Sequence, residues 1–453
     1  MSAAVDLFMK RAVVYGLLVV ALGCNLIAGA KVFRAGKSSG RDNPGPSLDL
    51  FAAVLERVRN DYVDGTNLSN RELVYSALKG MVNTLDPHSE FLEPERFKQL
   101  QDDTQGAFGG LGIVIALRDK FITVVAPIED SPGFKAGILT GDRIIKIAGK
   151  SAEKMSLDEA VKNLRGEPGT EVAITFFRPS TGATLDLKLE RAIINIDMVK
   201  DVNSKKEFPL GSAGIGYVRL VQFGEKTGEE LETALRKLKR QGMQAMILDL
   251  RWNPGGLLDQ AVAVCEKFLP RGKLVVTTEG RNPLNNSTHR AMGRGDELVA
   301  AAGAPLPLVV LVNLGSASAA EIVAGCLQDS RPNTIVLGEQ TFGKGSVQTI
   351  LPNPDGSALK LTMAKYYTPS HKVIHEHGIT PDVFVPMSDE EERDIFLQRT
   401  PGGIESLEEK DRERVRNSRD GQLDRATDLL KGMMLYARLQ PAEAAPGKLA
   451  AAK

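Results

Sequence analysis

Residues 307–329 read PLVVLVNLGSASAAEIVAGCLQD, and this stretch decides the class of fold. The apolar run at its start predicts a buried β-strand, and the run after residue 318 predicts a helix. Only small residues occupy the turn between them. A serine at such a turn can expose its hydroxyl, small neighbours let a substrate backbone approach, and helix N-terminal amides face a developing anion. The stretch therefore predicts an α/β fold with a candidate nucleophile at a strand end.

Two serines compete for this role, Ser316 and Ser318. The run from Ser318 to Glu321 also has the form of a capping box, in which Ser318 would only cap the helix. Spacing alone chooses neither between the two serines nor between a catalytic and a capping role.

The surrounding region, residues 213–386, alternates strand-like and helix-like segments. Its apolar strand segments include GIGYVRL and MQAMILDL, and an amphipathic helix is predicted for EELETALRKLKRQG between them. Alternation of this kind is typical of an α/β core with parallel strands.

A candidate base lies in GEQTFGKGSVQTI, residues 338–350, where Lys344 stands between two glycines. Most lysines are solvated surface charges, but a Gly-Lys-Gly loop before an apolar strand predicts a lysine that points inward. Burial disfavours the charged form, so such a lysine can lose its proton near neutral pH and activate a serine.

A third segment, ILDLRWNPGGLL at residues 247–258, predicts a buried strand that ends in a Pro-Gly-Gly turn before a helix. Glycines can present backbone N–H groups with no side chain in the way, which suits an oxyanion site. An ordinary strand–helix connection has the same pattern, so this segment alone decides nothing.

Together the three segments resemble the C-terminal processing (tail-specific) peptidases, a family of Ser/Lys proteases. The motifs G-S-A-S-A-A-E, G-x-x-T-F-G-K-G-x-V-Q and D-L-R-x-N-P-G-G stand in the order of that family. The segments 85–89 (LDPHS) and 366–370 (YYTPS) extend the resemblance over about residues 48–390.

The resemblance implies a serine endopeptidase with a crotonase-like α/β protease core, and we expect no cofactor and no metal. The site residues that it implies are the nucleophile Ser318, the general base Lys344, Gln348 as the residue that orients the lysine, and oxyanion donors in the backbone of Ala319 and of Gly255 or Gly256.

Residues 106–192 have a different character, because short β-rich runs alternate with Gly and Pro turns around one helical stretch. FGGLGI, residues 108–113, resembles the carboxylate-binding loop of a PDZ domain, where backbone amides bind a peptide's terminal carboxylate. The resemblance implies capture of protein substrates by apolar C-termini. The expected contacts are Gly110, Leu111, Gly112, Ile113 and Arg165, the last of which is equally well an ordinary surface arginine.

The N-terminus predicts export. Lys10 and Arg11 precede an uncharged apolar stretch, residues 12–30, that ends in Ala-Gly-Ala. This pattern is typical of a signal peptide, and its length also suits an uncleaved membrane anchor. We therefore expect the protein in the bacterial periplasm or on the outer face of the cytoplasmic membrane.

The expected organisation is linear. A signal peptide or anchor (1–31) and a linker (32–47) precede a helical region (48–105), a PDZ domain (106–192), the Ser/Lys protease core (193–390) and a helical or disordered C-terminal tail (391–453). Cys265 and Cys326 lie on apolar helix faces and are expected to be small core residues that can pair in an oxidising compartment.

Composition narrows the alternatives. Lys plus Arg equals Asp plus Glu at 57 each, so no basic excess points to nucleic acid. None of the five histidines carries a triad motif, and His375 and His377 have the wrong spacing for zinc ligands on a helix.

Expected partners are protein or peptide substrates, with a second copy of the chain or a regulatory adaptor left open. Other readings are a catalytically silent PDZ scaffold and a crotonase-type hydrolase.

Overall fold

The computed structural model describes residues 43–64, 68–128, 130–179, 181–293, 305–400 and 402–439. The predicted export segment, residues 1–31, lies outside the described residues. The chain forms two compact units, residues 1–78 and 79–453. Among the helices of the described residues, none is both long and apolar enough to span a bilayer.

The first unit contains α2 (Pro44–Asp61) and the start of α3 (Asn70–Asn83). The side chain of Asn43 caps α2 by accepting a hydrogen bond from the Gly45 amide at 3.2 Å. A reciprocal pair of hydrogen bonds between Ser69 and Glu72 begins α3. Because these caps satisfy amides that the first helical turn leaves unpaired, the local sequence accounts for both helix starts.

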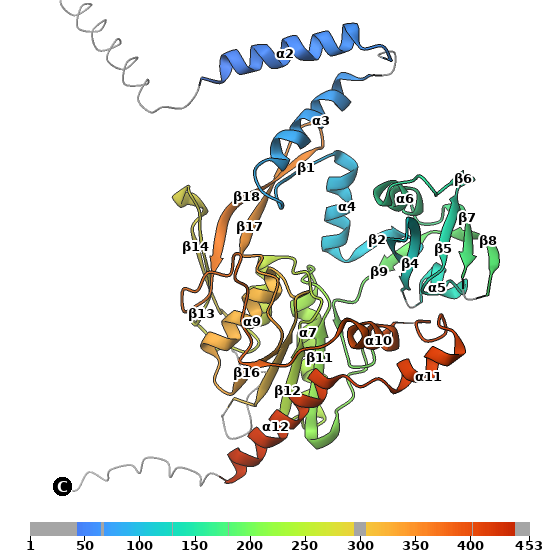
Figure 1. Ribbon diagram of the computed structural model, residues 1–453. Coiled ribbons are helices and arrows are strands. Elements are labelled where there is room, and N and C mark those ends of the chain that lie inside the picture. The colour runs from blue at the N-terminus through green and yellow to red at the C-terminus, as the bar shows by residue number, and fades with distance from the viewer. Residues whose placement is uncertain are drawn as a thin grey trace, which may run out of the picture. The chain divides into compact units, whose positions relative to one another are not determined.

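The core of the second unit is a six-stranded sheet in the order β10-β11-β12-β15-β16-β19. Figure 1 labels its strands β11, β12 and β16. Neighbouring strands are parallel, except that β10 runs antiparallel to β11. The strands are β10 (Val199–Lys200), β11 (Ile215–Leu220), β12 (Ala245–Asp249), β15 (Leu308–Val312), β16 (Thr334–Gly338) and β19 (Val383–Phe384).

Both faces of this sheet are covered. Alternate residues of a strand point to opposite faces, so Val310 packs with the helices α7 (Thr227–Arg240), α8 (Leu258–Cys265) and α9 (Ala319–Ser330). Its neighbour Val309 packs on the other face against α12 (Gly421–Leu439), which contacts β12, β15 and β16. Burial on both faces explains why these strands are continuous apolar runs.

A second, antiparallel sheet carries part of the candidate site. Its order is β1-β18-β13-β14, with β17 also paired to β18. A register shift between Val347 and Gln348 marks an irregularity in the pairing of β17 with β18. The strands are β1 (Glu90–Leu92), β13 (Leu274–Glu279), β14 (Ser287–Arg290), β17 (Ser346–Pro352) and β18 (Ala358–Tyr367).

A six-stranded antiparallel sheet with its own apolar core forms the segment 113–190. Buried Asp142 accepts two hydrogen bonds from the Arg178 guanidinium, at 2.8 and 2.7 Å, which ties the loop before β5 to the end of β7. Its elements are β3 (Ile113–Arg118), β4 (Phe121–Pro127), α5 (Pro132–Lys135), β5 (Arg143–Ile147), β6 (Lys150–Ser151), α6 (Leu157–Leu164), β7 (Glu171–Arg178) and β8 (Ala183–Glu190).

Short elements connect these parts. The pair β2 (Ala107–Gly110) and β9 (Ala192–Asn195) closes the two ends of the small domain together. The others are α4 (Pro94–Gln105), η2 (Ser212–Gly214), η3 (Pro283–Asn285), α10 (Asp389–Arg399) and α11 (Glu409–Asn417).

Cys265 and Cys326 are both fully buried and free, at the end of α8 and within α9. Burial raises the pKa of the Cys265 thiol, and the neighbouring Cys326 thiol raises it further. The two thiols are therefore neighbours between packed helices, as members of the core.

Candidate active site

Ser318 stands at the N-cap of α9 with φ 55° and ψ −113°, a backbone conformation that side-chain-bearing residues rarely adopt. Its exposed fraction is 7%. A conformation of this kind costs free energy and persists only where the surroundings hold it. The sharp turn from β15 into α9 is such a place, and it leaves the serine at the end of a strand.

Ser316 is held differently. It is fully buried, and its hydroxyl donates to the Leu250 carbonyl at 2.8 Å while accepting from the Asn313 amide at 3.0 Å. The Ser316 side chain thus ties the turn to the end of β12. This arrangement favours Ser318 over Ser316 as the nucleophile, an alternative that spacing left open.

The carboxylate of Glu321 joins the serine turn to the Gly-Lys-Gly loop. Oε2 accepts from the amides of Ser318 at 2.8 Å and Lys344 at 2.9 Å. Oε1 accepts from the Thr341 hydroxyl at 2.6 Å and the Gly343 amide at 2.7 Å. One buried side chain therefore fixes the backbone of both candidate catalytic residues. The capping box had suggested its bond to Ser318, but no sequence signal pointed to the other three.

The electrostatic environment suits a neutral amine at Lys344. Burial lowers the pKa of Lys344, and the positive charge of Lys360 lowers it further, whereas Glu321 opposes both effects. Burial also raises the pKa of the Glu321 carboxyl, although its hydrogen bonds act in the other direction. Burial thus shifts the pKa values of Lys344 and of the Glu321 carboxyl in the directions that favour their neutral forms.

Both glycines beside Lys344 are required by geometry. A Cβ on Gly345 would lie 2.1 Å from the His375 amide nitrogen, and Gly343 has φ 91°. Larger residues would clash at the first position and be strained at the second. The Gly-Lys-Gly pattern is therefore explained by close packing of this loop against residues 374–378.

In the antiparallel sheet, Tyr366 contacts Ser318, whereas the hydrogen bonds of the Gln348 side chain go to Ser346 and Thr362 and not to Lys344. Burial raises the pKa of Tyr366 to about 12, and a side-chain hydrogen bond with Ser318 opposes that rise. Tyr366 lies in the segment quoted for the resemblance, but sequence reasoning gave it no role. The Gln348 amide donates to the Ser346 hydroxyl at 2.8 Å and to the Thr362 hydroxyl at 3.4 Å.

The LDPHS segment lies beside the same strands. Asp86 accepts from the hydroxyls of Ser89 at 2.7 Å and Thr362 at 3.2 Å, which links it to the partner of Gln348. Burial lowers the pKa of His88, and the charge of Lys344 lowers it further. His88 is thus within electrostatic reach of the candidate base, a neighbour that the motif could have suggested.

The Pro-Gly-Gly turn packs directly against the serine turn. A Cβ on Gly255 would lie 2.7 Å from the Ser318 Cβ and 3.0 Å from the Ala319 nitrogen. The Gly255 amide already donates to the Asn253 side chain at 2.9 Å. Within the described residues, no acceptor binds the amides of Gly256 or Ala319. Gly256 is exposed. The geometry therefore favours Gly256 over Gly255 as a donor to a bound anion.

The candidate peptide-binding loop borders an apolar cavity of about 230 Å³. The carbonyls of Leu111 and Gly112 accept from Gly133 at 2.8 Å and Ile128 at 2.7 Å. No acceptor in the described part of the chain binds the amides of Leu111 or Gly112. The cavity lining includes Leu111, Gly112, Ile113, Val161, Leu164 and Arg165.

Arg165 lies at the edge of this cavity. Its guanidinium is 4.3 Å from the Phe108 ring centroid, and Nη2 pairs with Asp103 at 2.7 Å. Nη1 is buried, and within the described residues it has no hydrogen-bond partner. The two N–H bonds of Nη1 thus have no acceptor in the described part of the chain, which distinguishes Arg165 from a solvated surface arginine. Gly110 ends β2 just before the loop.

Across the described residues, no group of three or more His, Cys, Asp or Glu side chains has an arrangement that could hold a metal ion. His377 Nδ1 is 2.8 Å from the His375 carbonyl oxygen.

Comparisons with known proteins identify the family of the chain. Residues 214–385 match peptidase family S41, and residues 123–178 match a PDZ domain, which confirms the predicted family and the presence of a PDZ domain. The chain is 40% identical over 449 residues to a carboxy-terminal-processing protease of Bartonella bacilliformis, and the match covers 96% of this chain and 99% of that protein.

A second relative is the carboxy-terminal processing protease CtpA of Bacillus subtilis, 37% identical over 347 residues, with 76% of this chain and 70% of that protein covered. Among solved structures, a photosystem II D1 C-terminal processing protease is 32% identical, with a TM-score of 0.46 over 74% of this chain and 92% of that chain.

The two serines should respond to alanine in opposite ways. Ser318→Ala should abolish peptide hydrolysis and leave the melting temperature near that of the wild type. Ser316→Ala should keep activity at low temperature but lower the free energy of unfolding by about 1–3 kcal/mol, because it removes one donor from the Leu250 carbonyl and leaves the Asn313 amide without its acceptor. Urea unfolding and peptide hydrolysis measure both effects. A stable but inactive Ser316→Ala variant would reverse the assignment.

Glu321→Gln should reduce activity at least about tenfold, because an amide NH₂ would then face backbone N–H groups that need an acceptor. Thr341→Val is the control, since it removes one bond to the same carboxylate, together with the bond that the Thr341 hydroxyl accepts from the Ile379 amide, but leaves the bonds to Ser318 and Lys344. We expect it to retain most of the activity in hydrolysis assays. Equal activity in Glu321→Gln and wild type would show that the shared carboxylate does not organise the site.

Proposed function

The chain belongs to peptidase family S41 and is a serine-type carboxy-terminal processing protease, and on this premise we propose that it works through a Ser318–Lys344 dyad. The observation that carries the proposal is the Glu321 carboxylate, whose Oε2 binds the amides of both residues. These two candidate catalytic residues are 26 positions apart in the sequence, and one oxygen atom binds the backbone amides of both. The parallel sheet behind them supports a crotonase-like core.

In the proposed reaction Lys344 enters as a neutral amine. It takes the proton of the Ser318 hydroxyl while Oγ attacks the scissile carbonyl carbon. The resulting ammonium then gives that proton to the nitrogen of the departing peptide. Water, deprotonated by the same amine, hydrolyses the acyl-enzyme ester. The effect of burial and of Lys360 on the pKa of Lys344 supports this role, because both favour the neutral form.

We assign the oxyanion donors to the amides of Ala319 and Gly256. Both amides are without an acceptor in the described residues, and the turn that carries Gly256 packs against Ser318. Gly255 would serve as a close-packing residue whose own amide orders the turn. Backbone donors of this kind stabilise a tetrahedral intermediate because they are aimed before the charge develops.

Gln348 would orient the base indirectly. Its amide is bonded to Ser346 and Thr362, which fixes the strand that follows the Gly-Lys-Gly loop. Tyr366, hydrogen-bonded to Ser318, would hold the nucleophile's rotamer.

We further propose that the PDZ domain captures the apolar C-terminus of a protein substrate. Free amides at Leu111 and Gly112 would bind the terminal carboxylate, and the apolar cavity beside them would take the last side chain. Arg165 would sense the bound peptide through its unpaired Nη1. Gly110 and Ile113 would shape the loop on either side.

From residues 1–31, which also supply the candidate anchor, we propose export to the periplasm or to the outer face of the cytoplasmic membrane. A second copy of the chain or an adaptor protein is likewise a partner that we propose from the sequence. A silent scaffold would bind C-termini without hydrolysis, so turnover by purified protein distinguishes it from the protease proposed here.

The pH dependence should report Lys344. The value of kcat/KM should rise with pH through one ionisation whose midpoint lies below the ~10.4 of free lysine. Lys360→Met should move this midpoint to higher pH, because loss of a nearby positive charge makes Lys344 easier to protonate. Lys365→Met, which removes an exposed charge from the same strand, is the control. An unchanged midpoint in Lys360→Met, or activity in Lys344→Ala, would point to another base.

A charge introduced into the PDZ cavity should affect only the capture of the substrate peptide. Val161→Lys should weaken binding of a peptide with an apolar C-terminus at least about tenfold, since the pocket would lose its apolar character. Thr184→Lys, at an exposed site on β8, should bind normally. Fluorescence anisotropy with free-acid and C-terminally amidated peptides measures both. Equal affinity for the acid and the amide would contradict recognition of the terminal carboxylate.

A further inference from the structure

Arg251 is buried two residues before Asn253 in the Pro-Gly-Gly segment, and its side chain has no exposed surface. On one side it binds Asp249 at the end of β12. Nε donates to Asp249 Oδ1 at 3.0 Å, and Nη2 donates to Oδ2 at 2.7 Å. A charge without solvent contact must be fully paired, so the remaining N–H groups need acceptors from another part of the chain.

Those acceptors come from the start of α12. Asp420 accepts from both Nη atoms of Arg251, at 2.9 and 2.8 Å, and the Gln422 side-chain carbonyl accepts from Nη1 at 3.1 Å. Every N–H group of the guanidinium then has a partner. Arg399, at the end of α10, also donates to Asp420 at 2.8 Å. The C-terminal helices therefore complete a charge network that begins at the sheet.

Hydrogen bonds connect this network to the Pro-Gly-Gly turn. The Arg251 amide donates to Asp249 at 3.0 Å, and the next residue, Trp252, is forced to φ 57° with its amide bonded to Asn313. Asn253 then accepts from the Gly255 amide. A shift of the Arg251 backbone must displace this chain of bonds, and the Gly256 amide stands at its end.

We propose that Asp420 and Gln422 are positioning residues of the active site, which hold the Arg251 guanidinium and so fix the turn that carries the Gly256 amide. This inference rests on the proposed role of Gly256 as an oxyanion donor. It assigns to the C-terminal segment a part in transition-state stabilisation, although none of its residues touches the substrate.

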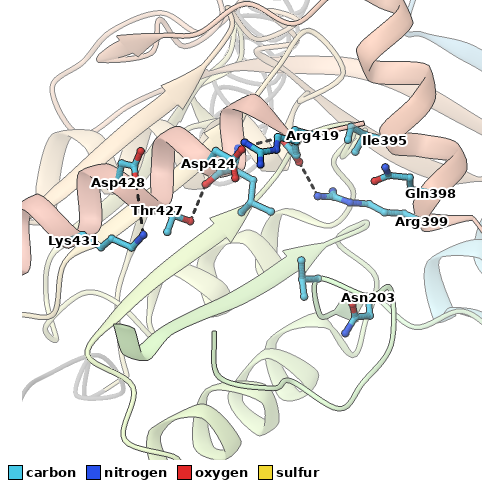
Figure 2. A pocket seen from close by; sticks show the side chains of 12 residues that line it. Asn203, Ile395, Gln398, Arg399, Arg419, Asp424, Thr427, Asp428 and Lys431 are labelled. Atoms are coloured by element: carbon cyan, nitrogen blue, oxygen red, sulfur yellow. Dashed lines mark hydrogen bonds and ion pairs between the residues drawn. The ribbon is translucent and has the colours of Figure 1, made fainter. Parts of the chain in front are cut away.

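The far side of the network opens to a cavity of about 850 Å³ that Arg399 and Asp420 help to line. Figure 2 shows Arg399 reaching toward the start of α12, and the Asp428–Lys431 pair farther along the same helix. The cavity gives small solutes a route to the place of the Asp420 carboxylate. It also provides a matched control, because Asp428 lines the same cavity and pairs with Lys431 at 3.7 Å.

The test compares full-length Asp420→Ala, Asp420→Asn and Asp428→Asn. We expect kcat to fall about 10- to 100-fold in Asp420→Ala, with KM changed less than about threefold, because the loss is confined to the transition state. Asp420→Asn should fall less, since its amide keeps one acceptor oxygen, and Asp428→Asn should match the wild type. Should Asp420→Ala fail to fold, the Asn variant carries the test.

Two further measurements separate positioning from general destabilisation. A peptide boronate, whose tetrahedral adduct occupies the oxyanion site, should lose affinity for the Asp420 variants by the same factor as kcat/KM, whereas binding of a product peptide should stay unchanged. Formate or acetate should restore part of the kcat of Asp420→Ala by entering the cavity. A purely structural Asp420 would lower the melting temperature without either effect.

The inference is overturned if folded Asp420 variants keep the wild-type kcat and boronate affinity, or if KM alone changes. Ser318→Ala is assayed in parallel. Activity in that variant would defeat the proposed dyad itself, whereas an inactive Ser318→Ala beside fully active Asp420 variants would defeat only the positioning role.

Discussion

The buried carboxylate of Glu321 is the group on which both halves of the active site depend. It is fully buried, yet its two oxygens accept four hydrogen bonds, so donors from the serine turn and the Gly-Lys-Gly loop offset part of the cost of its desolvation. The arrangement lets the fold hold Ser318 in a strained conformation and bring the backbone of Lys344 to the same point. Neither segment has this geometry by itself.

Polar side chains also position backbone turns elsewhere at this edge of the core. The parallel strands deliver their carboxyl ends to one edge, where β12 is followed by the Pro-Gly-Gly turn and β15 by the serine turn. Ser316 and Asn313 fasten these two turns together through bonds to Leu250 and Trp252. Polar side chains at this edge thus position backbone groups, among them the amides that we propose as oxyanion donors.

Much of this could be predicted from the sequence, because the decisive signals are local. An apolar run, a turn of small residues and a helix start identify the serine turn, and Gly-Lys-Gly identifies the inward lysine. Residue patterns alone left open the choice between Ser316 and Ser318, for which the family resemblance implied Ser318, and even the resemblance did not choose between Gly255 and Gly256. Both choices depend on which hydroxyl or amide meets an acceptor from a distant segment. For the same reason, the sequence could not predict the acceptors of Arg251 or the bonds of Glu321 to the Gly-Lys-Gly loop. The export segment, residues 1–31, stays a prediction.

The guanidinium of Arg251 and the carboxylate of Asp420 are 169 positions apart in the chain. A ribosome therefore completes the nucleophile turn and the lysine loop well before it supplies the acidic residue that closes the network behind them. Until α12 emerges and covers its face of the sheet, three of the five N–H groups of the Arg251 guanidinium lack their acceptors, and the apolar residues around Val309 stay open to water. The charge network behind the Pro-Gly-Gly turn can therefore close only after the start of α12 has been synthesised.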